Sequence, residues 1–114
     1  MKIYVAGPYS AETLSEREAN VERALAVGLQ LIARGHDPYI PHLTHYLDVF
    51  AKRYDMHISP EWYYRYDFHW MTICDALYFI GSSPGADRER EIMESLHRPI
   101  YTSLDEVPKV RFGE

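Results

Sequence analysis

The chain has 114 residues, a formal net charge of −5 and 46% hydrophobic residues, values typical of one folded domain over residues 1–114 and not of a disordered chain. The negative net charge gives no general attraction for polyanions, so long nucleic acid is not expected as a partner. The single cysteine, Cys74, rules out a disulfide framework and indicates a reducing compartment. Neither a signal-peptide pattern nor an apolar run of ~20 residues occurs, so we expect a cytoplasmic protein without membrane contact.

The first half of the chain predicts a strand followed by a long helix. Residues 2–6 form a short β-prone run that is closed by Gly7-Pro8. Ser15 and Glu18 have the spacing of a capping box, and the helix that they open should end at Arg34. The expected apolar stripe of this helix comprises Val21, Ala24, Leu25, Gly28, Leu31 and Ile32.

The remaining elements continue the alternation between strands and helices. In chain order they are a strand over 38–40, a helix over 43–53, a loop over 55–58, a helix over 60–73 opened by Ser59-Pro60, a buried strand over 76–80, a turn over 81–85, a helix over 86–97, a strand over 99–102 and a helical turn over 103–107.

Alternating strands and helices predict an α/β protein: a three-layer αβα fold with a small Rossmann- or flavodoxin-like parallel sheet of four or five strands. Ligands bind such sheets beyond the carboxyl ends of the strands. Three segments follow strands here, namely Gly7-Pro8-Tyr9-Ser10, Pro41-His42 and residues 81–85. We expect these three loops to converge at one edge of the sheet.

The helix after the turn at 81–85 carries a carboxylate on its inward side. Its apolar residues are Ile92, Met93 and Leu96. Glu89 lies three positions before Ile92 and four positions before Met93, so it shares their side of the helix. A partly buried carboxylate near a helix start needs a partner or a function. The alternative is an acid that is held there only by the helix dipole.

Three motifs together resemble a known family. They are residues 4–9 (Tyr-Val-Ala-Gly-Pro-Tyr), Asp67 and Asp75 in the pattern D-x7-D, and the pattern S-x-G-x-x-x-E from Ser83 to Glu89. Their order and spacing are similar to those of the nucleoside 2-deoxyribosyltransferase-like superfamily. More narrowly, the chain resembles the short, largely uncharacterised branch of that superfamily and its nucleoside 5′-monophosphate N-glycosidases.

The resemblance implies catalytic roles for three residues. Glu89 would be the nucleophile that attacks the anomeric carbon of a (deoxy)ribosyl group and forms a covalent glycosyl ester. Tyr4 would donate a hydrogen bond to this nucleophile, although an aromatic residue in a strand is also explained by core packing. Asp67 would protonate or hydrogen-bond the leaving nucleobase, whereas a solvated helix carboxylate is the alternative.

The resemblance also implies a phosphate subsite. Ser83 stands where the transferases tend to carry aspartate and the monophosphate N-glycosidases carry serine, and a carboxylate would repel phosphate. Gly85 and Ala86 keep the turn small, so that backbone N–H groups at the helix start can hold an anion. Ser10 and Arg17 are further candidate donors. A serine before Pro-Gly is also explained by an ordinary turn or helix cap.

The expected activity is therefore hydrolysis of the N-glycosidic bond of a nucleoside 5′-monophosphate. The loop Gly7-Pro8-Tyr9 instead resembles that of the transferases, so the first alternative is a nucleoside 2-deoxyribosyltransferase that exchanges bases. The second alternative is a nucleotide-sensing module without catalysis.

No metal and no cofactor are expected, since the six histidines follow no metal-binding spacing and no phosphate-cradling motif occurs. His42 is expected to contact the base or the sugar. A chain this short closes a pocket poorly, so we expect a homodimer or a higher homo-oligomer. Its interface should include aromatic residues of the 59–73 helix, where Trp62, Tyr63, Tyr64 and Tyr66 crowd together.

Overall fold

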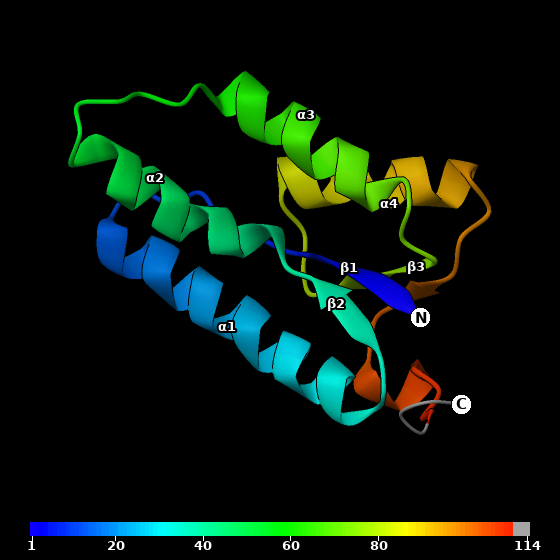
Figure 1. Ribbon diagram of the computed structural model, residues 1–114. Coiled ribbons are helices and arrows are strands. Elements are labelled where there is room, and N and C mark those ends of the chain that lie inside the picture. Colours follow the sequence, from blue (N-terminus) through cyan, green and yellow to red (C-terminus); the bar gives the residue numbers. More distant parts are fainter. Residues whose placement is uncertain (111–114) are drawn as a thin grey trace.

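Four parallel strands form one sheet in the order β2-β1-β3-β4 (Figure 1), in a computed structural model that describes residues 1–110. The strands are β1 (Lys2–Ala6), β2 (Asp37–Tyr39), β3 (Ala76–Phe79) and β4 (Ile100–Tyr101). The helices are α1 (Leu14–Ala33), α2 (Thr44–Lys52), α3 (Pro60–Met71) and α4 (Pro84–Ser95), with single 3₁₀ turns η1 (Pro41–Leu43) and η2 (Leu104–Glu106). The predicted α/β class with its parallel sheet is confirmed.

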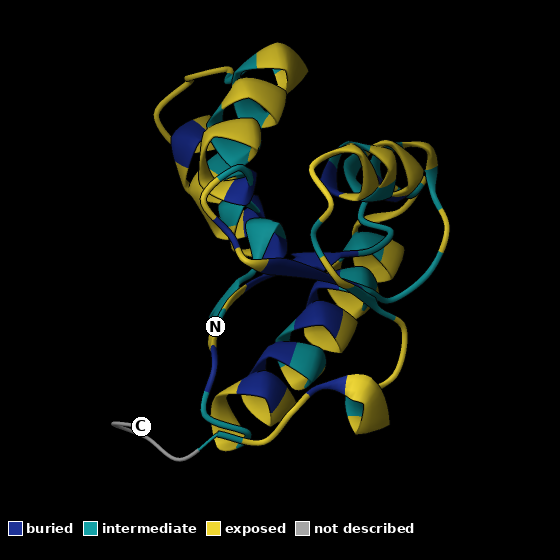
Figure 2. Ribbon diagram, turned by 90° about the vertical axis from the view of Figure 1, so that its right-hand side faces the viewer, coloured by how far each residue is buried: buried dark blue, intermediate teal, exposed yellow. Residues whose placement is uncertain are grey.

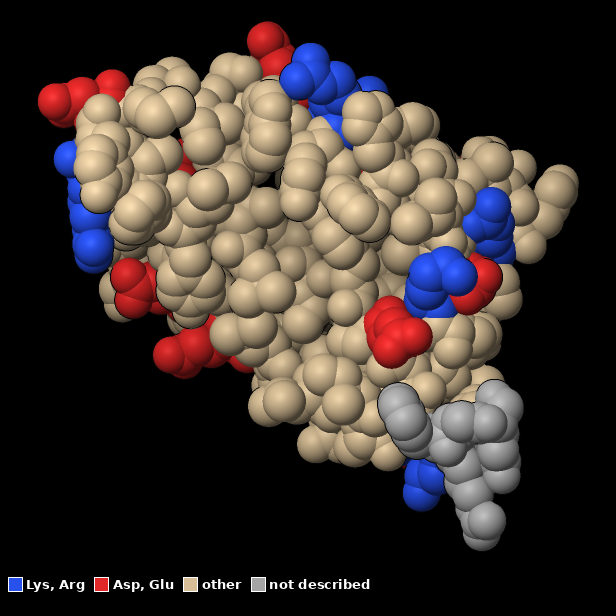
Figure 3. Space-filling model, in the orientation of Figure 1, with Lys and Arg blue, Asp and Glu red and all other residues tan. Residues whose placement is uncertain are grey.

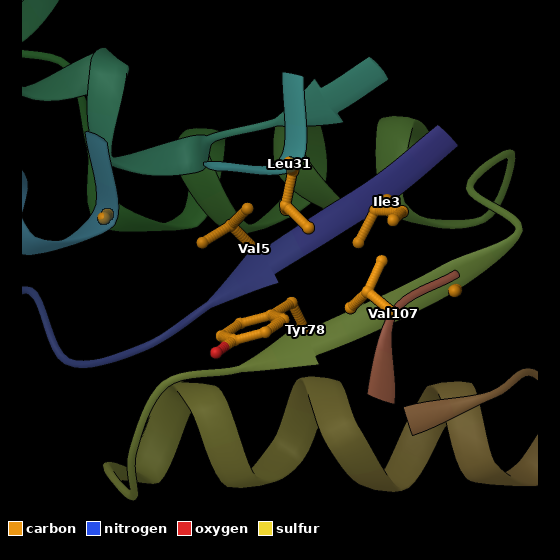
Figure 4. Packing of buried hydrophobic residues seen from close by; sticks show 7 residues of the cluster. Ile3, Val5, Leu31, Tyr78 and Val107 are labelled. Atoms are coloured by element: carbon orange, nitrogen blue, oxygen red, sulfur yellow. The ribbon is translucent and has the colours of Figure 1, made fainter. Parts of the chain in front are cut away.

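Helices cover both faces of the sheet because the side chains of β1 and β3 alternate between two cores (Figure 2). Toward α1 and η2 the cluster in Figure 4 includes Ile3, Val5, Leu31, Tyr78 and Val107. Toward α3 and α4 a second cluster contains Tyr4, Ala6, Met71, Cys74, Leu77, Ala86 and Met93. From Ile3 to Ala6, β1 thus has no solvent-facing side, which explains why this part of the strand carries no charged residue.

The caps of α1 and α3 differ in how well the sequence predicts them. α3 begins as expected, with the Ser59 hydroxyl accepting a bond from the Trp62 amide at 3.2 Å. In α1 the predicted cap Ser15 is wrong. Thr13 caps this helix and accepts from the Glu16 amide at 3.1 Å. Thr13 and Glu16 have the same capping-box spacing as Ser15 and Glu18, and the earlier pair adds residues to the helix.

Two residues assigned to buried helix stripes are exposed instead. Ile32 lies one residue past the buried series Val21, Ala24, Gly28 and Leu31, and it is 56% exposed. Leu96 is 42% exposed because α4 ends at Ser95, before the stripe completes another turn. Between residues 1 and 110, no helix is long and apolar enough to cross a membrane.

Candidate active site

The three predicted loops meet around Pro8, as expected from the parallel sheet. The His42 ring nitrogen Nε2 lies 3.1 Å from the Pro8 carbonyl oxygen. A Cβ atom on Gly81 would lie 3.9 Å from Pro8 Cδ, and one on Gly7 would lie 3.0 Å from Ile80 Cβ. Gly7 therefore allows the end of β1 to approach the end of β3 closely.

Glu89 and Tyr4 form the centre of the candidate site. Tyr4 is fully buried in the middle of β1, and its hydroxyl donates a short hydrogen bond to Glu89 Oε2 on the second turn of α4. Burial raises the pKa of Glu89 to about 7; the bond from Tyr4 acts in the opposite direction, and the nearby charge of Asp67 raises this pKa further. Burial and the charge of Glu89 also raise the pKa of Tyr4, so its hydroxyl stays a donor.

Asp67 on α3 forms a second pair of the same kind with Tyr39. The Tyr39 hydroxyl on β2 donates to Asp67 Oδ1 at 3.1 Å. Burial raises the pKa of Asp67 to about 6, and the bond from Tyr39 counteracts part of this rise. Two half-buried carboxyl groups therefore share one site, each held by a tyrosine hydroxyl.

Tyr39 was missed in the sequence, although a signal was present. β1 and β2 pair in parallel register with Tyr4 opposite Tyr39, so the two rings lie on the same face of the sheet. Their ring centroids are 5.5 Å apart and stacked. On its other side Tyr39 stacks on Trp70 of α3 at 5.9 Å. The aromatic column fixes the direction of both hydroxyl groups.

The aromatic residues of α3 point in different directions, as their crowding required. Trp62, Tyr66 and Trp70 share one side of the helix, with Trp62 stacked on Tyr66 at 4.8 Å. Tyr63 turns toward α2 and donates to Asp48 Oδ1 at 2.9 Å. Tyr64 is exposed.

The first loop is held by groups on α1 and α2. The Tyr9 hydroxyl lies 2.7 Å from His45 Nδ1, and Asn20 donates to the Tyr9 carbonyl at 3.0 Å. Arg17, a candidate phosphate donor, donates instead to the Ala11 carbonyl at 2.8 Å, while Ser10 is exposed. His45 is a further residue that sequence reasoning missed, because nothing in its local pattern connects it with Tyr9.

His42 lies beneath this loop and not at the surface. It is only 4% exposed, and its Nδ1 atom has no hydrogen-bond partner among the described residues. Burial lowers the pKa of His42, which favours the neutral ring. Within residues 1–110 there is no cluster of three His, Cys, Asp or Glu side chains suited to a metal ion.

The start of α4 is capped by Ser83, whose hydroxyl oxygen accepts from the Ala86 amide at 3.1 Å. The neighbouring Ser82 donates to the Asp87 carboxylate at 2.8 and 2.9 Å. A Cβ atom on Gly85 would meet nothing within 4 Å, so this side of the turn is open. As a cap, Ser83 still has its own O–H available to a ligand.

Comparison with solved structures identifies a protein with a similar fold. Neither a family model nor a curated protein matches the chain. A 2-deoxyribosyltransferase from the psychrotolerant bacterium Bacillus psychrosaccharolyticus superposes with a TM-score of 0.64. The match covers 98% of this chain and 93% of that one, at 16% sequence identity. The protein is therefore an α/β protein with the fold of that 2-deoxyribosyltransferase.

The raised pKa of Glu89 predicts a pH-dependent effect of Glu89→Gln on stability. The folded-state value of about 7 lies above the ordinary value of 4.5, so folding favours the protonated acid. Stability from this group falls as the pH rises through about 7. At pH 8 the variant should be more stable than wild type by about 1–3 kcal/mol, and at pH 4 the difference should vanish. Urea unfolding at both pH values measures the difference in the free energy of unfolding between the variant and wild type.

The control is Glu91→Gln, at an exposed position on the same helix. A Glu89→Gln variant whose free energy of unfolding differs from wild type by the same amount at both pH values would contradict the burial of a charge.

A second prediction concerns the bond between Tyr39 and Asp67. Tyr39→Phe removes a donor that favours the ionised carboxylate, so the pKa of Asp67 should rise further above about 6. The pKa of Asp67 is measured by following its carboxyl carbon chemical shift as the pH is changed. Tyr63→Phe is the matched control, because that hydroxyl bonds to Asp48. An Asp67 titration that is the same in wild type and Tyr39→Phe would refute the contact.

Proposed function

We propose that the chain is a member of the nucleoside 2-deoxyribosyltransferase-like superfamily and hydrolyses the N-glycosidic bond of a nucleoside 5′-monophosphate. One observation carries this proposal: two carboxyl groups, Glu89 and Asp67, lie in one site with pKa values of about 7 and about 6. Paired acids whose ionisation lies near neutral pH are typical of glycosyl transfer, in which one acid attacks and the other protonates. The structural match to a 2-deoxyribosyltransferase supports the same chemistry.

Near neutral pH the pair holds about one proton, and the reaction starts from the form in which Asp67 carries it. This form lies about 1.4 kcal/mol above the form protonated on Glu89, because the pKa of Glu89 is about one unit higher. In the proposed first step an oxygen of ionised Glu89 forms a bond to the anomeric carbon. The bond from that carbon to the base nitrogen breaks, and its electron pair stays on the nitrogen, which takes a proton from protonated Asp67. Tyr4 orients the attacking carboxylate through its hydrogen bond. The developing positive charge on the sugar is stabilised by the carboxylate that then bonds to it.

In the second step a water molecule attacks the same carbon and gives a proton to the Asp67 carboxylate. The ester bond to Glu89 breaks, which restores the ionised nucleophile and releases a sugar 5-phosphate. Both acids return to their starting protonation states. If a second base attacks in place of water, the same intermediate yields a new nucleotide or nucleoside.

The preference for a monophosphate is supported by the start of α4. Glu89 and Ser83 lie on the same short stretch, and the helix N-terminus carries backbone N–H groups and a partial positive charge that suit phosphate. We propose the Ser83 hydroxyl and the Gly85 amide as the main phosphate contacts. Ala86 keeps this turn small, while its own amide donates to the Ser83 oxygen. The loop Gly7 to Ser10 would line the remaining substrate site, with no cofactor and no metal. His42, which is buried beneath this loop, would support it through the Pro8 carbonyl and would not touch the substrate, contrary to the expectation from the sequence.

A 2-deoxyribosyltransferase is the second candidate, because the structural neighbour is a 2-deoxyribosyltransferase and the first loop carries Gly7-Pro8-Tyr9. A homodimer or a higher homo-oligomer remains our prediction for either activity.

Glu89→Gln should reduce base release by at least ~10³-fold, because the amide cannot form the glycosyl ester. Chromatography of the reaction products measures the release. Glu91→Gln, on the exposed side of α4, should leave turnover unchanged. Full turnover by Glu89→Gln would refute the nucleophile. Tight nucleotide binding without any cleavage by wild type would favour a sensing module instead.

The two candidate activities are separated by Ser83→Asp. Aspartate also caps helices, so α4 should persist while a negative charge faces the phosphate. For a monophosphate N-glycosidase we expect kcat/KM to fall by at least ~10-fold with a deoxynucleoside monophosphate but not with the deoxynucleoside. Ser59→Asp is the control, since Ser59-Pro60 caps α3 in the same way. Base exchange by wild type with an added free base and no phosphate preference would instead identify the transferase.

A further inference from the structure

The side of α3 that carries Asp67 carries a second polar group one helical turn earlier. Tyr63 lies four positions before Asp67, a spacing at which two side chains are neighbours on a helix. Its hydroxyl donates to Asp48 Oδ1 on α2 at 2.9 Å. Partial burial and Asp48 raise the pKa of Tyr63, and Tyr9 and Asp67 lie close enough to raise it further. The Tyr63 hydroxyl therefore lies among α2, the first loop and Asp67, and the proposed mechanism gives it no role.

The direction of the bond between Tyr63 and Asp48 is fixed by Lys52. Asp48 pairs with Lys52, whose Nζ atom lies 3.0 Å from Oδ2. Burial acts to raise the pKa of Asp48, but the hydrogen bonds from Lys52 and Tyr63 outweigh it, so this pKa is lowered and the group is ionised at neutral pH. An ionised carboxylate has no proton to donate, so the Tyr63 hydroxyl has to be the donor. What remains on the Tyr63 oxygen is the capacity to accept a hydrogen bond.

The surroundings of Tyr63 favour a donor without a full charge. The negative charge of Asp48 is already balanced by Lys52. On the face of the molecule on which α2 and α3 lie, charged side chains are found mainly around the margin (Figure 3). A cation would lose its hydration here and find the Asp48 carboxylate already paired. A neutral N–H group is therefore the better partner for the Tyr63 oxygen.

The proposed mechanism places the nucleobase against this oxygen. Asp67 has to reach the base nitrogen that leaves the sugar, so the base would lie along the side of α3 that carries Asp67 and Tyr63. The exocyclic group of a base lies across the ring from the nitrogen bonded to the sugar, just as Tyr63 lies one turn of α3 away from Asp67. This group is an amino group in adenine and cytosine, where it donates hydrogen bonds. It is an oxo group, which only accepts, in hypoxanthine and uracil.

We propose, building on the proposed function, that Tyr63 selects a nucleobase with an exocyclic amino group over the corresponding base with an oxo group. An amino N–H donates to the Tyr63 oxygen, whereas an oxo oxygen would bring a second acceptor against the first. A site that hydrogen-bonds a substrate group rejects the analogue that cannot make the bond, since a polar group is then left unpaired. The preferred substrates are therefore nucleotides of adenine or cytosine.

Two pairs of bases test this selection: adenine against hypoxanthine, and cytosine against uracil. Each base is offered as the nucleoside and as the 5′-monophosphate, with ribose and with deoxyribose, and base release is followed by chromatography. For at least one pair, wild type should cleave the amino member with a kcat/KM at least ~10-fold above that of the oxo member. Tyr63→Phe should lower this ratio by at least ~5-fold, through a loss on the amino member. Because the same pair is compared in both proteins, the intrinsic lability of the two glycosidic bonds cancels.

The matched control is Tyr64→Phe, which removes an exposed hydroxyl from the adjacent position of α3. This variant should keep the wild-type ratio. If Tyr63 only supported the fold, Tyr63→Phe would lower the turnover of both members alike and leave the ratio unchanged. The ratio therefore separates selection of the base from a structural role.

Binding to the Glu89→Gln variant tests the selection without the reaction. Calorimetry with the same pairs should show at least ~5-fold tighter binding of the amino member, and adding Tyr63→Phe should remove the difference. If wild type cleaves none of the compounds, the proposed hydrolysis is refuted, while the binding comparison still decides the role of Tyr63.

Three results would overturn the selection by Tyr63. The first is a wild type that cleaves or binds both members of each pair equally, or that favours the oxo members, even if hydrolysis itself is confirmed. The second is an amino preference that Tyr63→Phe leaves unchanged. The third, a chain that neither cleaves nor binds any of these compounds, would overturn the proposed function as well.

Discussion

The arrangement of the candidate site depends on one hydrogen bond in the protein interior, between Tyr4 and Glu89. A buried phenol needs an acceptor, and a buried carboxylate needs a donor. Here each satisfies the other, and the bond joins the centre of the sheet to α4. Because the carboxyl group loses most of its hydration, its pKa rises to about 7. The burial that holds Glu89 against Tyr4 is therefore also the cause of its raised pKa.

A second hydrogen bond between a tyrosine hydroxyl and a carboxyl group lies next to the first. The Tyr39 hydroxyl donates to Asp67, and the stacking of Tyr39 on Tyr4 places the two pairs side by side. The two carboxyl groups have different pKa values since Glu89 is more deeply buried and also faces the charge of Asp67. With these values the pair holds about one proton near neutral pH, so that one acid is ionised while the other is protonated.

Much of the fold was predictable because its signals are local. Short apolar runs, prolines, glycines and cap residues mark every strand and helix, and strands separated by helices imply a parallel sheet. The errors also have local causes. The predicted start of α1 was wrong because two capping boxes overlap in the sequence. Ile32 was expected in the core because the apolar stripe of α1 was extended by one residue too many. The bond from Arg17 to the Ala11 carbonyl could not be foreseen, because it depends on how the loop folds back on α1.

The sequence by itself determined the α/β architecture, the convergence of three loops at one sheet edge, and the inward position of Glu89, because these follow from helix and strand periodicity. Only the tertiary structure decided the partners: Tyr39 beside Asp67 and His45 beside Tyr9. These contacts join residues 28 or 36 positions apart. They depend on strand register and helix packing, which no local pattern of side chains encodes.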